Sequence, residues 1–140
     1  MSIHEARLEL EFAVPPARLW EAITDHEGMS KWAGAQVRLV ARGDAEGVGA
    51  VRRIRVGALA LDEEVVYADA PRRLVYRVVR GAPLRFHRGE MLVLPSARGS
   101  LLRWNILLAS DVPGFARVTA RTLELALGRG LRELRGLIGG

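Results

Sequence analysis

Cysteine is absent from this chain of 140 residues, and histidine, lysine and the aromatic residues are scarce. Without cysteine the chain can form no disulfide bond and no metal site built on thiolates. The histidines lie far apart in the sequence, at His4, His26 and His87, and lack the short spacing of metal ligands. We therefore expect no metal ion and no other cofactor.

Long apolar runs are also missing. No segment approaches the roughly 20 consecutive apolar residues that span a bilayer, so we expect no membrane insertion. The first residues, MSIHEARLELEF, have neither the basic start nor the apolar block of a secretory signal. A cytoplasmic protein of bacterial type is the resulting expectation.

Lysine occurs once, at Lys31, so that 20 of the 21 basic residues are arginine. The formal net charge is +5, but the arginines are spread along the chain apart from short pairs such as Arg52-Arg53. No basic strand carries the aromatic side chains on which single-stranded RNA readers stack bases. The composition predicts a solvated basic surface and no nucleic-acid partner.

Common catalytic signatures are missing as well, because the chain has no G-x-S-x-G elbow, no P-loop and no dinucleotide fingerprint. The glycine-containing stretch GVGAVRR, residues 47–53, leads into a strand-like segment rather than a helix. An enzyme built from this sequence would have to act by shaping and protonating a reactive ligand.

Alternation of apolar and polar residues dominates what is present, and it predicts β-strands. Seven such segments are bounded by glycine and proline, at residues 3–12, 35–41, 48–56, 58–68, 72–79, 84–94 and 100–110. Their regular spacing is typical of an antiparallel sheet built as a meander.

Three segments instead predict helices. Residues 14–25 place proline at a first helical turn and give Leu19, Trp20 and Ile23 helical spacing, and residues 26–34 form a short second helix or turn. Residues 115–138 repeat apolar side chains at threes and fours, which predicts one amphipathic helix roughly 36 Å long. We expect one α+β domain over residues 1–140, in which a curved sheet and the long helix leave a cavity between them.

Glu63 is out of place in the predicted strand ALALDEEVVYA. Counting by twos puts it on the apolar face, with Leu59, Leu61, Val65 and Tyr67. A buried carboxylate is costly unless it is paired. A two-residue turn at Gly57-Ala58 would place Arg52 directly opposite Glu63 and so supply a partner.

Such a pair has two readings. A buried ion pair is often no more stabilising than apolar packing of the same volume, so it fits a polar feature of a ligand cavity. The alternative is a structural staple in a wet end of that cavity.

Together, four segments resemble the START-like (helix-grip) SRPBCC superfamily, most nearly its polyketide cyclase/dehydrase and lipid-transport group. They are VPPARLWEAITDHEGMSKWAG, GVGAVRRIRVG, EEVVYADAPRRLVYRVVRGAP and RGEMLVLPSARGSLLRW, and the likeness extends over residues 3–138. The resemblance implies a curved seven-stranded antiparallel sheet wrapped around a long C-terminal helix, two short helices after the first strand, and a ligand cavity. It implies no particular reaction, because the superfamily has no universal catalytic motif.

The inward face of the other strands supplies further candidates. Alternation places Tyr76 and Trp104 inward, and the family pattern favours the set with His87, Gly89 and Met91 on the sixth strand. We name Glu63, Arg52, His87 and Tyr76 as catalytic candidates. The alternative for His87 is an ordinary hydrogen-bonded or surface residue, which is the commoner role of a lone histidine, and the alternative for Tyr76 is a core aromatic with a polar tip. The expected ligand-binding set is Met29, Trp32, Glu63, Val65, Tyr67, Tyr76, His87, Met91, Trp104, Leu123 and Leu127.

Three functions remain open on the sequence alone. The first is binding of a small hydrophobic or aromatic ligand, lipid-like or polyketide-like, and the second is a polyketide cyclase or dehydratase acting in the same cavity. The third is a co-chaperone-like or ribosome-associated interaction module, which predicts no ligand-sized cavity. Whether the chain forms a homodimer is also left open.

Overall fold

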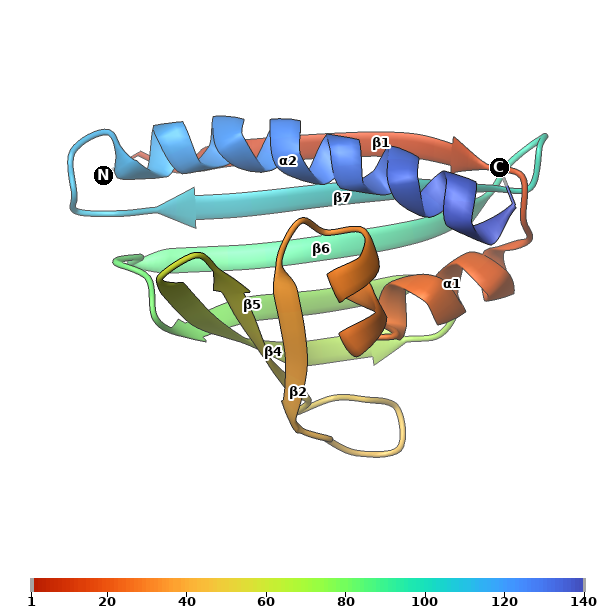
Figure 1. The fold of residues 1–140 in the computed structure, drawn as a ribbon, viewed down its shortest axis with the longest axis horizontal. Helices are drawn as coiled ribbons and strands as arrows, with labels where there is room; N and C mark the ends of the chain where they lie inside the picture. The colour runs from red at the N-terminus through yellow and green to blue at the C-terminus, as the bar shows by residue number, and fades with distance from the viewer. Residues whose placement is uncertain (1, 140) are drawn as a thin grey trace.

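The chain is described over residues 2–139 by a computed structural model. Seven antiparallel strands form one sheet in the order β1-β7-β6-β5-β4-β3-β2, and a long helix lies along β1 and β7 (Figure 1). In chain order the elements are β1 (His4–Phe12), α1 (Pro16–Thr24), η1 (Glu27–Lys31), β2 (Gln36–Ala41), β3 (Val51–Val56), β4 (Leu59–Asp69), β5 (Arg73–Arg80), β6 (Phe86–Pro95), β7 (Ser100–Ala109) and α2 (Phe115–Ile138).

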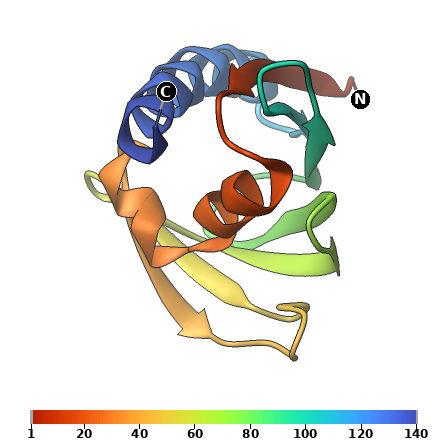
Figure 2. The same ribbon diagram turned by 90° about the vertical axis from the view of Figure 1, so that its right-hand side faces the viewer.

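The sheet is strongly curved. An end-on view shows it bending around the space occupied by α1 and α2 (Figure 2). Part of the bend comes from irregular pairing, because the register shifts once between β2 and β3 and twice between β4 and β5. Such bulges increase the local twist of a strand pair. The predicted α+β fold is confirmed, with a 3₁₀ helix, η1, as the second short helix.

The two α-helices form where the spacing of apolar residues predicts them. Helix α1 begins with a proline in its first turn and buries Leu19 and Ile23 completely. Helix α2 buries Leu131 and Leu134 in its C-terminal half. Gly130 lies on the same face, where an added Cβ would overlap the backbone carbonyl of Trp32. Glycine at this position therefore lets α2 approach the end of η1.

Strands β6 and β7 alternate as predicted. Leu102, Trp104, Ile106 and Leu108 of β7 are all buried, and Met91 and Val93 of β6 lie beside them. Gly89 also faces inward, where the ring of Tyr76 covers it so closely that a Cβ would overlap the ring. The inward set favoured on the sixth strand is confirmed.

Tyr67 is a correction to the sequence prediction. The pairing between β4 and β5 shifts between Val65 and Tyr67, so the alternation that places Tyr67 inward is broken by one residue. Its side chain is 43% exposed and lies under the guanidinium of Arg73, with the Cζ atom 5.1 Å from the ring centroid. The predicted inward position of Tyr67 is therefore wrong.

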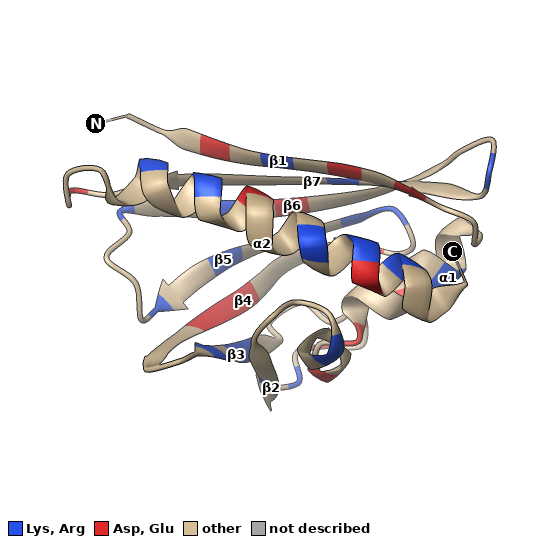
Figure 3. Ribbon diagram, turned by 45° about the horizontal axis from the view of Figure 1, so that its top comes forward, with Lys and Arg blue, Asp and Glu red and all other residues tan. Residues whose placement is uncertain are grey.

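The outer surface carries many arginines among carboxylates. Figure 3 shows basic residues spread along α2 and over several strands, with acidic residues between them. On the outer face of the sheet, Arg53 and Arg80 both contact Asp62, each at 2.9 Å. Among residues 2–139, no helix is both long and apolar enough to cross a membrane.

Candidate functional site

A cavity of about 260 Å³ lies between α2, the segment following η1, and the inner face of the sheet. Its walls are mainly apolar, and its polar side chains are Arg52, Glu63, Tyr76, His87 and Thr122. The other lining residues are Met29, Ala33, Gly34, Ala35, Val37, Ile54, Val56, Leu61, Trp104, Ile106, Leu123, Ala126 and Leu127. Apolar walls with a few convergent polar groups are typical of small-molecule sites.

Arg52 and Glu63 form an ion pair in the wall of this cavity. The β3–β4 hairpin places the two residues directly opposite each other, which confirms the predicted pairing. Arg52 Nε–H donates to Glu63 Oε1 at 2.9 Å, and Arg52 Nη2 lies 2.8 Å from the same oxygen. The second oxygen, Oε2, makes no hydrogen bond with any residue between 2 and 139.

The rest of the Arg52 guanidinium is enclosed by protein. Its Nη1 group donates to Met29 Sδ at 2.9 Å and lies 3.4 Å from His26 Nδ1. Its Cζ atom is 4.8 Å from the centroid of the Tyr76 ring. Burial, followed by the charge of Arg52, lowers the pKa of His26 from 6.5 to about 4. His26 is therefore a neutral neighbour at physiological pH.

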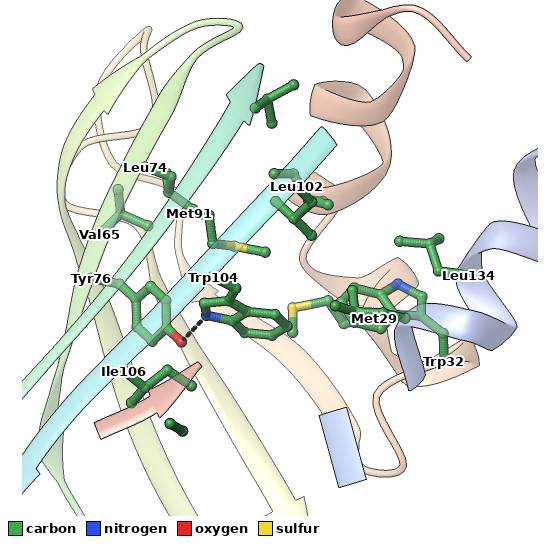
Figure 4. Close-up of a cluster of buried hydrophobic side chains, with 14 of the residues drawn as sticks. Met29, Trp32, Val65, Leu74, Tyr76, Met91, Leu102, Trp104, Ile106 and Leu134 are labelled. Atoms are coloured by element: carbon green, nitrogen blue, oxygen red, sulfur yellow. Dashed lines mark hydrogen bonds between the residues drawn. The ribbon is translucent and has the colours of Figure 1, made fainter. Parts of the chain in front are cut away.

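Tyr76 and Trp104 form the next polar contact along the wall. The indole N–H of Trp104 donates to the Tyr76 hydroxyl at 2.9 Å, and the indole lies between Tyr76 and Met29 (Figure 4). Burial, and then the negative charge of Glu63, raises the pKa of Tyr76. The phenol therefore keeps its proton, and the hydroxyl remains able to donate while it accepts from Trp104.

His87 has one ring nitrogen occupied and one available. The backbone N–H of Val78 donates to His87 Nδ1 at 3.0 Å, so the proton of the neutral imidazole lies on Nε2. Burial lowers the pKa of His87 and favours this neutral form. The ring centroid is 5.6 Å from that of Tyr76. His87 thus contributes a hydrogen-bond donor to this region.

Two polar atoms of the residues in the cavity wall have no hydrogen-bond partner among the described residues. Within residues 2–139, Ser96 Oγ is the side-chain polar atom that is fully buried without a hydrogen-bond partner. Glu63 Oε2 and His87 Nε2 also lack partners there but are not fully buried, and both residues line the cavity. With the Tyr76 hydroxyl, the polar groups of the wall comprise one acceptor without a partner and two donors. No group of three or more acidic or histidine side chains in the described residues could hold a metal ion.

The structure brings most of the expected ligand-binding residues together. The cavity is lined by Met29, Glu63, Tyr76, His87, Trp104, Leu123 and Leu127. Val65 and Met91 are buried in the core outside its lining, and Tyr67 lies on the opposite face of the sheet. Trp32 contacts Trp104 edge to face, at 6.3 Å between ring centroids, and lines a separate open cleft of about 390 Å³ between α1 and α2.

Several wall residues are absent from the set expected from the sequence. Ile54 and Leu61 belong to the same hairpin register as Arg52 and Glu63, so the alternation alone could have indicated them. Ala33, Gly34 and Ala35 lie in the irregular segment after η1, where no periodicity marks an inward residue. Thr122 and Ala126 lie on the exposed edge of α2, beside the predicted apolar stripe.

Comparison with known proteins gives a family match and several similar folds. The family model described as polyketide cyclase / dehydrase and lipid transport matches residues 4–139. A solved structure from Thermus thermophilus has a TM-score of 0.76 at 20% sequence identity, covering 96% of this chain and 97% of that one. A structure from Mesorhizobium loti has a TM-score of 0.74 at 20% identity, covering 96% of each chain. One from Thermobifida fusca has a TM-score of 0.71 at 28% identity, covering 96% of this chain and 93% of that one. No curated protein sequence matches the chain.

Proposed function

The chain belongs to the polyketide cyclase/dehydrase and lipid transport family, and from this premise we propose that it binds a small hydrophobic or aromatic ligand in the cavity beneath α2. The observation that carries the proposal is the cavity itself, which is mainly apolar but has an ion pair, a tyrosine and a histidine in its wall. Burying polar groups of this kind in an apolar wall has a cost that a specific ligand contact would explain.

The cavity also argues against the third function, a co-chaperone-like or ribosome-associated interaction module, because that function predicts no ligand-sized cavity. Its walls come from the sheet, from α2 and from the segment after η1, so a ligand would be enclosed from several sides. A cytoplasmic location remains a prediction, and analytical ultracentrifugation would decide whether the chain forms a homodimer.

Equilibrium dialysis with the uncharged apolar probe N-phenyl-1-naphthylamine tests the proposal. We expect saturable binding to the wild-type protein and a loss of at least about tenfold in affinity for Ala126→Trp, which fills the cavity wall from α2. The matched control is Leu125→Trp on the same helix, because Leu125 is 76% exposed and lies outside the cavity lining. Absence of saturable binding, or equal loss in both variants, would show the proposal to be wrong.

Catalysis in the same cavity is a second candidate, favoured by the accessible carboxylate oxygen of Glu63 and the two nearby donors. Glu63 would accept a proton from the ligand while Tyr76 or His87 donated a hydrogen bond to the oxygen that gains negative charge. His87 is better suited to donate than to act as a base, because its Nδ1 already accepts from Val78. Turnover of a polyketide-like substrate that survives Glu63→Gln combined with His87→Ala would exclude this assignment.

A further inference from the structure

We propose that the cavity selects an uncharged ligand whose polar end is a hydroxyl, as in a phenol or an alcohol, and rejects ligands that end in a carboxylate. The inference rests on the proposed function and adds the chemistry of the ligand's polar end. It follows from how Arg52, Glu63, Tyr76 and His87 share their hydrogen bonds.

The positive charge in the cavity wall is already neutralised. Arg52 is 2% exposed, and its Nε and Nη2 groups both contact Glu63 Oε1. Its Nη1 group points at Met29 and His26, while the flat face of the guanidinium lies over Tyr76. A ligand carboxylate would have to displace Glu63 from this arrangement to gain an arginine partner.

The Glu63 carboxylate, by contrast, keeps one oxygen without a hydrogen-bond partner in the described part of the chain. Both contacts from Arg52 go to Oε1, so Oε2 can accept a hydrogen bond from a bound molecule. A carboxylate ligand has no proton to donate to this oxygen and would place a second negative charge beside it. A hydroxyl ligand has one such proton, and hydrogen bonds to charged groups are stronger than those between neutral groups.

Two neutral donors complete the site. The Tyr76 hydroxyl accepts from Trp104 and can give its own proton to the ligand. His87 presents Nε2–H because Val78 occupies Nδ1. A hydroxyl group donates once and accepts up to twice, so its hydrogen-bonding capacity matches one acceptor and two donors. Of the residues that line the cavity, Arg52 and Glu63 alone carry a formal charge, and their charges cancel.

Titration calorimetry near neutral pH with three probes that share one ring system tests the inference. The probes are 2-naphthol, which is uncharged, 2-naphthoate, which is ionised, and naphthalene, which has no polar end. We expect 2-naphthol to bind about tenfold more tightly than naphthalene, as one hydrogen bond to a charged group implies, and 2-naphthoate to bind most weakly. Wild-type protein that binds 2-naphthoate as tightly as 2-naphthol would overturn the inference.

A second arm separates aromatic from aliphatic hydroxyls. It compares decahydro-2-naphthol with its parent hydrocarbon decalin, in the same way as 2-naphthol with naphthalene. The inference requires that at least one of the two hydroxyl compounds binds more tightly than its parent, and the larger gain identifies the class of hydroxyl. Gains in neither pair would contradict it.

Paired variants locate the effect. Arg52→Met combined with Glu63→Leu removes both charges, so the ratio of the 2-naphthol affinity to the naphthalene affinity should fall towards one. The matched control is Arg53→Met with Asp62→Leu, the adjacent pair of the same hairpin on the outer face of the sheet, which should keep the wild-type preference. A preference that persists when the inner pair is removed would refute the role of Glu63.

The two proposals fail in different ways. If none of the probes binds, the ligand-binding function is wrong and the selectivity falls with it. If naphthalene binds but neither hydroxyl compound binds more tightly than its parent, the cavity function stands and the hydroxyl preference alone is wrong.

Discussion

At the scale of single residues, the stability of the interior depends strongly on keeping Arg52 and Glu63 together. Glu63→Leu alone leaves a buried guanidinium without its partner, so we expect the free energy of unfolding to fall by about 3–5 kcal/mol. Arg52→Met combined with Glu63→Leu removes both charges and is expected to remain within about 1 kcal/mol of wild type or to exceed it. Urea denaturation of the two variants measures the difference. A single variant no less stable than the double one would show that the pair is not coupled.

Gly89 is a second residue at which a small change should have a large effect. A methyl group there overlaps the ring of Tyr76, which Trp104 and Arg52 also contact. We expect Gly89→Ala to reduce the free energy of unfolding by about 1–3 kcal/mol, the usual cost of overpacking a core. It should also weaken probe binding, because Tyr76 lines the cavity. Denaturation and dialysis of the variant provide the measurements, and wild-type values in both would contradict the expected clash.

Single residues also show where sequence reasoning succeeds. The Arg52–Glu63 pairing follows from a glycine turn and strict alternation, both of which are local properties of the chain. The sequence prediction puts Tyr67 on the wrong face because the alternation of apolar and polar residues does not reveal the bulge after Val65. The contact of His26 with Arg52 joins residues 26 positions apart and depends on how η1 meets β3, so no local pattern indicates it.

At the scale of elements, the glycines of α2 can be tested for whether they allow close packing of the helix. Helix propensity alone predicts that replacing glycine with alanine stabilises a helix by up to about 1 kcal/mol. We expect this gain for Gly128→Ala, whose new methyl group would lie 3.6 Å from Leu8 Cδ2, an ordinary contact. Gly130→Ala should instead destabilise the protein, because its methyl group overlaps the Trp32 carbonyl. Thermal denaturation of both variants makes the comparison, and equal gains would show that α2 does not depend on close approach to Trp32.

Elements with a clear period are the ones that the sequence predicts well. The spacing of apolar residues gives α2 its observed bounds, Phe115–Ile138, and the turn residues separate all seven strands. The cavity wall contributed by Ala33, Gly34 and Ala35 could not be predicted, because an irregular segment takes its position from the elements on either side. The cavity volume depends on the same long-range packing.

At the scale of the whole molecule, His26 couples stability to pH. The pKa of His26 is about 4 in the folded chain and about 6.5 in the unfolded chain. Between pH 4 and pH 6.5 the unfolded chain therefore binds a proton at His26 that the folded chain does not. The free energy of unfolding should therefore be greatest above pH 6.5 and fall as the pH decreases towards 4. The lowered pKa of His87 acts in the same direction.

Urea midpoints measured at several pH values between about 7 and 4 test this dependence. Arg52 and Asp25 are the charged groups that act on His26, and the lowering effect of burial and Arg52 on its pKa exceeds the opposing effect of Asp25. We expect His26→Gln to flatten the dependence, because glutamine has no proton to bind in this range. An unchanged slope in that variant would assign the effect to other groups.

The contact between Trp104 and Tyr76 has a practical consequence for the intact protein. Of its three tryptophans, Trp104 borders the cavity, with its indole N–H bound to the Tyr76 hydroxyl. Indole emission responds to the polarity of its surroundings, and a molecule that engages the tyrosine would change them. Trp104 is therefore an intrinsic fluorescence probe of the cavity, and the tryptophan emission of the unlabelled protein should change when a ligand binds there.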